Sequence, residues 1–277
     1  MKASVIEMDE EKGKIIFEDI TPSFINTIRR VMVSRVPKMA VDTVELHLGS
    51  IRGEDGKEYE SVTPLFDEIV AHRIAMVPIP TDIDEFNFPE ECSCGGVGCE
   101  KCQIVYRLDK KGPGMVYSGD IEPLNHDYVI KIPDIPIVKL EENQAIMAYV
   151  IAKLGTAKQH AKWLAALAVG YKYYPKISID NKKCDAPECK ACVDICPKNV
   201  LEIKRNKLTV VKLEDCTMCN SCVEVCDSGA VKVEGDKNKI MYRYETDGSY
   251  DAKGVLIQTL KEGEKLFKDL KKAITSV

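Results

Sequence analysis

The sequence has no long hydrophobic run: none of its apolar stretches approaches the roughly twenty residues that a membrane-spanning helix needs. Residues 1–20 are rich in acidic side chains, so we expect neither a signal peptide nor a membrane anchor there. Positive charge is not in excess either, because 39 Lys and Arg stand against 44 Asp and Glu, giving a net charge of −5. Domains that bind a phosphate backbone by themselves are usually strongly basic, so direct DNA binding by this chain alone is not expected.

Catalytic signatures are also missing from the sequence. It contains no glycine-rich dinucleotide fingerprint and no acidic triplet typical of a catalytic magnesium site, and we predict no catalytic residue. The chain has 277 residues, 45% of them hydrophobic and 30% charged. This composition is that of an ordinary globular protein, and the length allows two domains or more.

Cysteine, in contrast, is abundant: the chain has twelve. Eight of them form two runs with matching spacing, Cys184-x4-Cys189-x2-Cys192-x3-Cys196 and Cys216-x2-Cys219-x2-Cys222-x3-Cys226. The last three cysteines of each run repeat at a fixed offset, which indicates an internal duplication. Because no secretory signal accompanies them, the cysteines favour metal ligation in a reducing, cytoplasmic compartment over a disulfide framework.

The duplicated runs resemble those of two-cluster bacterial ferredoxins, in which the fourth ligand of each iron–sulfur cluster comes from the other repeat. The resemblance implies a ferredoxin-like domain over residues 181–235 with two [4Fe–4S] clusters. The first set of ligands would be Cys184, Cys189, Cys192 and Cys226; the second would be Cys196, Cys216, Cys219 and Cys222. Two features depart from the pattern. The first gap is four residues instead of two, so the first site could hold a cluster of either three or four irons. In addition, the last cysteine is followed by Asp227, where ferredoxins usually have proline. Zinc is the weaker alternative, since zinc sites use paired Cys-x2-Cys knuckles.

A third group of cysteines reads Cys92-x-Cys94-x4-Cys99-x2-Cys102. The intervening Gly95, Gly96 and Gly98 allow the loop to double back so that four sulfur atoms converge. Four thiolates in a loop of this size suit tetrahedral zinc. The alternative is a loop without metal, whose thiols stay free or pair on oxidation.

The N-terminal segment predicts a β-hairpin and then a helix. Residues 2–8 and 14–18 alternate polar and apolar side chains, and Thr21 and Pro22 are suited to start a helix over residues 21–36. An extended segment follows at 39–46. This helix, followed by Val-Pro and Ala-Val-Asp-Thr-Val-Glu, resembles the start of the α-like subunit family of cellular RNA polymerases, most closely its archaeal D-subunit branch. In that family the helix packs against a partner subunit and seeds assembly.

Other segments resemble the same family. His-Arg-Ile-Ala at 72–75 and Gly155 to Trp163 are similar to its second domain, and Glu-Thr-Asp-Gly-Ser at 245–249 precedes a long terminal helix as it does there. A eukaryotic relative carries a zinc loop at the place of residues 92–102. From its composition we expect the alanine-rich segment 144–169 to be helical.

The predicted terminal helix, 252–276, carries a narrow apolar seam. Leu256, Leu260, Gly263, Phe267, Leu270 and Ile274 recur in steps of four and three, as in a heptad repeat. Charged side chains fill its other faces. A seam this narrow favours one partner helix over a broad core, although packing on its own domain is the alternative.

The resemblance implies an α+β fold and three domains. These are a discontinuous dimerisation domain (1–46, 170–180 and 236–277), a middle domain (47–169) and the ferredoxin-like domain. It implies a non-catalytic assembly-platform subunit of archaeal DNA-dependent RNA polymerase that pairs with the small α-like subunit L and contacts other small subunits and a large catalytic subunit. The residues expected to bind L are Phe24, Ile25, Ile28, Met32, Leu256, Leu260, Phe267, Leu270 and Ile274. The clusters would then brace a domain needed for assembly. The alternative is a ferredoxin-type electron-transfer subunit of an oxidoreductase, and clusters that sense oxygen remain open.

Overall fold

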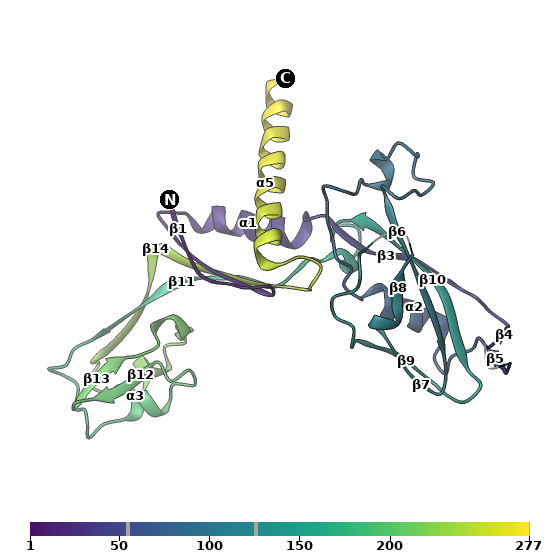
Figure 1. Ribbon diagram of the computed structural model, residues 1–277. Coiled ribbons are helices and arrows are strands. Elements are labelled where there is room, and N and C mark those ends of the chain that lie inside the picture. The colour runs from purple at the N-terminus through teal and green to yellow at the C-terminus, as the bar shows by residue number, and fades with distance from the viewer. Residues whose placement is uncertain (54–55, 125–126, 277) are drawn as a thin grey trace. The chain divides into compact units, whose positions relative to one another are not determined.

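The computed structural model describes residues 1–53, 56–124 and 127–276 (Figure 1). The chain divides into two compact units, each assembled from segments distant in sequence. Unit 1 comprises residues 1–6, 14–26 and 170–242, and unit 2 comprises 7–13, 27–169 and 243–277. Helices and antiparallel sheets occur together, as expected for an α+β fold. Among the described residues, no helix combines the length and apolar character needed to cross a membrane.

A four-stranded sheet joins the N-terminal hairpin to the segments that flank the cysteine-rich region. Its order is β1 (Lys2–Met8), β2 (Lys12–Glu18), β14 (Val231–Thr246) and β11 (Ala166–Ile179). The predicted hairpin is therefore confirmed. Phe17 and Tyr242 pack edge to face in the sheet's core, with ring centroids 6.3 Å apart. The strands β11 and β14 are long because they carry the chain into and out of the cysteine-rich region, where Asp180 N donates to Ala230 O at 2.8 Å.

The cysteine-rich region is built from very short elements. They are α3 (Ala191–Asp194), β12 (Leu201–Lys204), β13 (Lys207–Val210), η4 (Leu213–Asp215) and α4 (Ser221–Glu224). The hairpin β12–β13 turns through Arg205 and Asn206, whose φ angles are +51° and +59°. Two positive φ values are what a two-residue hairpin turn of the right twist requires. The buried residues here are Cys192, Val200, Leu201, Leu208, Cys216, Ala230 and Val231, and Cys192, Leu201, Leu208 and Val231 pack together in one cluster.

Unit 2 holds a second four-stranded sheet in the order β3 (Lys38–Leu46), β10 (Ala145–Gly155), β6 (Gln103–Lys111) and β8 (Ile121–Pro123). Helix α2 (Asp67–Ala75) packs against β3 and β9 (Pro136–Leu140), and its buried Val70 and Ile74 enter the core. Shorter elements complete the unit: β4 (Ser50–Arg52), β5 (Glu58–Glu60), β7 (Gly114–Tyr117), η1 (Pro89–Glu91), η2 (Ser118–Asp120) and η3 (Ala161–Trp163).

The prediction of a helix over residues 144–169 is wrong. The segment forms β10, then η3, and then the start of β11. In β10 the buried positions are every second residue from Ile146 to Leu154, among them Ala148 and Ala152. This period of two is a strand signal. The intrinsic propensity of alanine favours a helix. The strand forms instead because β10 pairs with both β3 and β6 along its length, at the centre of the sheet.

Two long helices complete the chain. Helix α1 (Pro22–Ser34) begins as predicted, since Phe24 N donates to the Thr21 hydroxyl at 3.4 Å, and it ends two residues earlier than predicted. Helix α5 (Ala252–Thr275) is capped by Asp251, whose carboxylate accepts from Gly254 N at 2.8 Å. Its buried residues, Ala252, Val255, Gln258 and Thr259, all lie in its first turns. Beyond them no described residue of the helix is buried.

Candidate metal centres

The four cysteines of the 92–102 loop converge on one point. Their sulfur atoms all lie within 4.8 Å of one another, and this is the one group of metal-ligand side chains among the described residues that does so. The Sγ–Sγ separations are 3.5 Å for Cys92–Cys99, 3.6 Å for Cys94–Cys102 and 3.8 Å for Cys99–Cys102. A tetrahedral zinc ion with Zn–S bonds of about 2.3 Å has sulfur–sulfur edges of about 3.8 Å. The loop therefore has the dimensions of a site for one tetrahedral ion.

The backbone of this loop explains the convergence. Gly95, Gly96 and Gly98 adopt φ angles of +68°, +82° and +110°, which side-chain-bearing residues rarely adopt. Gly95 N bonds Cys92 O, and Cys102 N bonds Cys99 O, each at 2.9 Å, so both pairs of cysteines sit in tight turns. The chain then enters β6 directly after Cys102, which ties the loop to the sheet of unit 2.

The thiols of the loop differ in acidity. Backbone N–H from Gly98, assisted by the Cys92 and Cys102 thiols and Gly96 N–H, lowers the pKa of Cys94 to about 6. Burial raises the pKa of Cys102 to about 12. Metals bind the thiolate, so Cys94 offers a ligand that is already ionised at neutral pH, whereas Cys102 must release a proton on binding.

The eight other cysteines form two groups with the composition expected from the ferredoxin pattern. Burial raises the pKa of Cys192 to about 11, and the neighbouring charges that add to this come from Cys184, Cys226 and Cys189. Burial likewise raises the pKa of Cys222, with further contributions from Cys216, Cys196 and Cys219. The structure thus brings Cys226 to the first set and Cys196 to the second, so each repeat contributes one cysteine to the other's group.

The two sets lie in mostly apolar surroundings. Cys184, Cys192 and Cys226 pack in the small core of Leu201, Leu208 and Val231. The second set lines a small cavity together with apolar side chains, chiefly Ile177, Pro197, Val200, Leu201 and Val233. Backbone N–H groups point at its sulfurs, with Val200 N 3.5 Å from Cys196 Sγ and Met218 N 3.4 Å from Cys216 Sγ. An apolar cavity with N–H···S contacts is the environment in which iron–sulfur clusters are held and tuned.

The two kinds of group differ in size. A cube of irons and sulfides is larger than a single ion, so its cysteine sulfurs must stand farther apart. The spacing in 92–102 suits one ion, and neither set in 184–226 has all its sulfurs within the same short limit. All twelve cysteines are free of disulfide bonds. The residues present therefore fit two clusters in the cysteine-rich region and one ion in the 92–102 loop.

Comparison with known proteins agrees with this division. Residues 50–168 match the family described as "RNA polymerase Rpb3/RpoA insert domain", and residues 183–230 match "4Fe-4S dicluster domain". A protein of Thermoplasma volcanium called DNA-directed RNA polymerase subunit Rpo3 is 38% identical over 261 residues, covering 94% of each chain. A protein of Picrophilus torridus with the same name is 34% identical over 272 residues, covering 98% of each chain.

The chain belongs to the Rpo3 family of archaeal RNA polymerase subunits. It is therefore a subunit of DNA-directed RNA polymerase, and its partners are other subunits of that enzyme. The family indicated by the sequence motifs is confirmed, as is the presence in this chain of an Rpb3/RpoA insert domain and a ferredoxin-like 4Fe-4S dicluster domain.

The residues expected to dock a partner have unequal exposure. On α5, Leu256 is half-buried, while Leu260, Phe267, Leu270 and Ile274 are between 51% and 66% exposed. On α1, Phe24 is 41% exposed, but Ile25, Ile28 and Met32 are buried inside this chain. The expectation that these three contact a partner is corrected. The apolar stripe of a surface helix typically packs against the core of its own domain.

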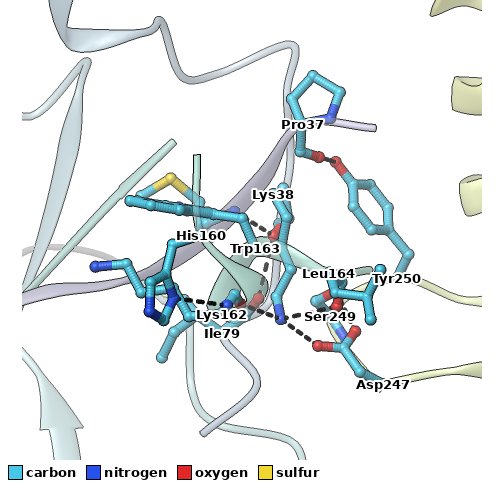
Figure 2. Close-up of polar contacts among 12 residues, drawn as sticks. Pro37, Lys38, Ile79, His160, Lys162, Trp163, Leu164, Asp247, Ser249 and Tyr250 are labelled. Carbon is cyan, nitrogen blue, oxygen red and sulfur yellow. Dashed lines mark hydrogen bonds and ion pairs between the residues drawn. The ribbon is translucent and has the colours of Figure 1, made fainter. Parts of the chain in front are cut away.

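A buried ion pair escaped the sequence analysis (Figure 2). Lys38 is 4% exposed, and its ammonium pairs with the Asp247 carboxylate and donates to Lys162 O (3.1 Å) and Leu164 O (3.4 Å). Tyr250 donates to Pro37 O at 2.7 Å beside it. The motifs that resembled the polymerase family, Val-Pro at 36–37, Gly155–Trp163 and Glu-Thr-Asp-Gly-Ser, thus meet around one ammonium group. The family motifs marked these segments in the sequence. They did not indicate that Lys38 and Asp247, which are 209 positions apart, form an ion pair.

Proposed function

We propose that this chain is the non-catalytic assembly platform of the archaeal polymerase and that it pairs with the small α-like subunit L through α5. The observation that supports this is the apolar seam of that helix, which is exposed from Leu260 onward. From Leu260 to Ile274, four large apolar side chains face away from the chain's interior. Burying each such side chain typically contributes about 1.5–3 kcal/mol, so a partner helix along the seam has enough apolar surface to bind stably.

The pattern of burial along α5 supports one partner helix. Its first turns bury Ala252, Val255, Gln258 and Thr259 within the chain, so the seam residues are not needed for that packing. A Cβ added at Gly263, in the middle of the seam, would meet no atom within 4 Å. A small residue here allows a second helix to approach closely, as at the narrow interfaces of paired helices. On α1, Phe24 is the one predicted contact residue that is exposed and available to L.

We also propose that the eight cysteines of 184–226 hold two [4Fe–4S] clusters, and Cys92, Cys94, Cys99 and Cys102 a zinc ion, all with a structural role. The cysteine-rich region has only short helices, one hairpin and few buried apolar side chains. Such a region gains folding free energy from metal binding that its own core does not supply. The clusters would then keep this region folded for assembly with the other subunits.

The experiment that tests the platform is an affinity measurement with purified subunit L. Phe267→Ala combined with Leu270→Ala removes the centre of the seam. We expect Kd to rise at least about 30-fold, since two buried side chains together contribute more than about 2 kcal/mol. Lys265→Ala, an exposed position on the same helix, is the matched control and should leave Kd unchanged. Equal Kd values for the double variant and the control would exclude α5 as the docking helix.

Assembly tests the structural role of the clusters. Cys219→Ser removes one expected ligand of the second cluster, and we expect the resulting protein to copurify poorly with the other polymerase subunits. Ser221→Ala is the matched control, because it removes only the hydroxyl that lies 3.5 Å from Cys219 Sγ and leaves all eight thiols in place. Normal copurification of the Cys219→Ser protein with every partner would contradict a bracing role.

One observation favours a second function, electron transfer. Cys189 and Cys219 are exposed, so an edge of each cluster would lie near the surface, as electron transfer requires. The proteins that copurify with the chain separate the two functions. Subunit L and the large polymerase subunits support the platform, whereas a flavoprotein or a hydrogenase supports electron transfer. Oxygen sensing is excluded if the affinity for L is the same before and after air oxidation.

A further inference from the structure

Two lysines of the unit 1 sheet contact the segment that leads into the second cysteine set. Lys14, on β2, places its ammonium 2.7 Å from the Glu214 carboxylate. Lys172, on β11, donates to two backbone carbonyls, Glu214 O and Cys216 O, each at 2.7 Å. The strands β2 and β11 lie on either side of β14 in the sheet. One short segment is therefore held from two strands at once.

The segment before the first set is held by backbone bonds instead of lysine side chains: Asp180 N donates to Ala230 O at 2.8 Å, and Lys183 N donates to Asp180 O at 3.1 Å. The duplication of the cysteine runs thus does not extend to their anchorage. The difference lies in residues outside the repeats, because Lys14 is 200 positions and Lys172 is 42 positions from Glu214.

The contacts of Lys172 differ from an ordinary surface ion pair. A cation that bonds two converging carbonyls fixes the backbone to which they belong, and charge-assisted bonds of this kind are stronger than neutral ones. Cys216 itself is buried, so its position depends on this backbone. The ammonium also lies next to a cluster ligand. A nearby positive charge favours the reduced cluster, which carries one more negative charge than the oxidised one.

We propose that Lys14 and Lys172 are positioning residues that fasten the ligand loop of the second cluster to the four-stranded sheet. Filling of the second site then stabilises β2 and β11 through these lysine contacts. This inference rests on the proposed cluster at Cys196, Cys216, Cys219 and Cys222. The stability of the unit 1 sheet then depends on whether the second cluster is bound.

The test compares anaerobically purified full-length proteins. Lys172→Met and the double variant with Lys14→Met remove the contacts, Lys172→Arg retains the charge and the donors, and Lys232→Met, an exposed lysine of β14, is the control. Amide exchange of β2 and β11 is measured before and after iron removal. The reduction potential of each cluster is measured by EPR, with Cys184→Ser and Cys219→Ser proteins assigning the two signals.

We expect iron to protect β2 and β11 in the wild type, and this protection to fall at least about tenfold in Lys172→Met, as the loss of charge-assisted bonds implies. The potential of the second cluster should become more negative in Lys172→Met and recover in Lys172→Arg, while the first cluster's potential stays unchanged. Recovery of the potential in Lys172→Arg, which keeps the charge and the donors, distinguishes the effect of the cation from a general loosening of the region.

Two results would overturn the inference, and they are distinguishable. If the wild type binds iron at the second set but Lys172→Met matches Lys232→Met in both exchange and potential, the lysines do not fasten the loop. If the wild type binds no iron at the second set, the proposed cluster fails and this inference fails with it.

Discussion

The 92–102 loop and the cysteine-rich region of 184–226 both gather thiols, but they are supported by very different surroundings. The loop continues into β6, whose sheet belongs to a core of twenty-one buried residues among those that the structure describes. The hydrophobic cluster of the cysteine-rich region has only four buried residues among those described, and one of them, Cys192, is itself an expected ligand. A metal at the first place is added to a protein that is already folded. Clusters bound by the cysteines of 184–226 would instead supply most of what a hydrophobic core supplies elsewhere.

Small domains often need a metal because the fraction of surface that a chain buries on folding decreases with its length. A short chain therefore buries little apolar area by itself. Residues 181–235 are in this range of size. We therefore expect that removing metal from the 92–102 loop unfolds only that loop, whereas removing metal from the cysteines of 184–226 unfolds the whole cysteine-rich region.

Anaerobic removal of iron with a chelator tests the largest of these effects. We expect residues 181–230 to lose nearly all protection from amide exchange, because cluster binding supplies their folding free energy. Strands β6 and β10 should keep their protection, since their core contains no metal ligand from 184–226. Exchange measured by mass spectrometry gives both answers in one experiment. Persistent protection of β12 and β13 without iron would show that the few buried side chains suffice.

The next effect is independent of metal. Asp247→Ala leaves the buried ammonium of Lys38 without its carboxylate, and breaking a buried pair in this way typically costs about 3–5 kcal/mol. Urea unfolding of unit 2, followed by Trp163 fluorescence, measures the loss, and Glu245→Ala at an exposed position is the control. Adding or removing zinc should leave this loss unchanged. A loss that disappears with zinc bound would mean that the 92–102 loop and the ion pair stabilise unit 2 together.

Much of this arrangement was readable from the sequence, and the failures have identifiable causes. The cysteine spacings predicted the two exchanged groups because ligand geometry is encoded in short intervals and repeats. The strand β10 was mistaken for a helix because alanine propensity outweighed the alternation from Ile146 to Leu154. Ile25 and Met32 were expected at an interface because an apolar helical stripe looks the same whether it faces its own core or a partner. Lys38 and Lys172 could not be found, since their partners are set by tertiary contacts.

Removal of the loop's metal should have a smaller effect. Cys99→Ser is expected to abolish zinc binding and to expose residues 88–102 to exchange. The sheet of unit 2 should lose about 1 kcal/mol or less, because local opening of a loop need not involve the core beneath it. Ser93→Ala, within the same loop, is the matched control. Metal analysis and the thermal midpoint of unit 2 measure the two effects separately. A large fall in the midpoint would place the loop among the elements that hold the sheet together.

The smallest expected effect is a change in how zinc affinity depends on pH. Binding requires thiolates, so affinity rises with pH wherever binding displaces protons. The pKa of Cys94 is lowered to about 6, so above that pH this thiol is already ionised and releases no proton on binding. Cys99 and Cys102, whose pKa values are raised, continue to release theirs. A plot of log affinity against pH should therefore be steeper below about pH 6 than above it.

A variant of the loop glycine sharpens this last prediction. Replacing Gly98 by alanine removes the conformation that aims its N–H at Cys94, since φ is +110° there and the new Cβ would meet the Gln103 side chain at 2.5 Å. In that variant the change of slope should move toward the ordinary thiol pKa. A competition titration with a chromophoric chelator across about pH 5 to 9, which spans the lowered value and the ordinary thiol pKa of about 8.5, would detect it. An unchanged slope in the wild type across the whole range would mean that Cys94 is protonated until zinc arrives.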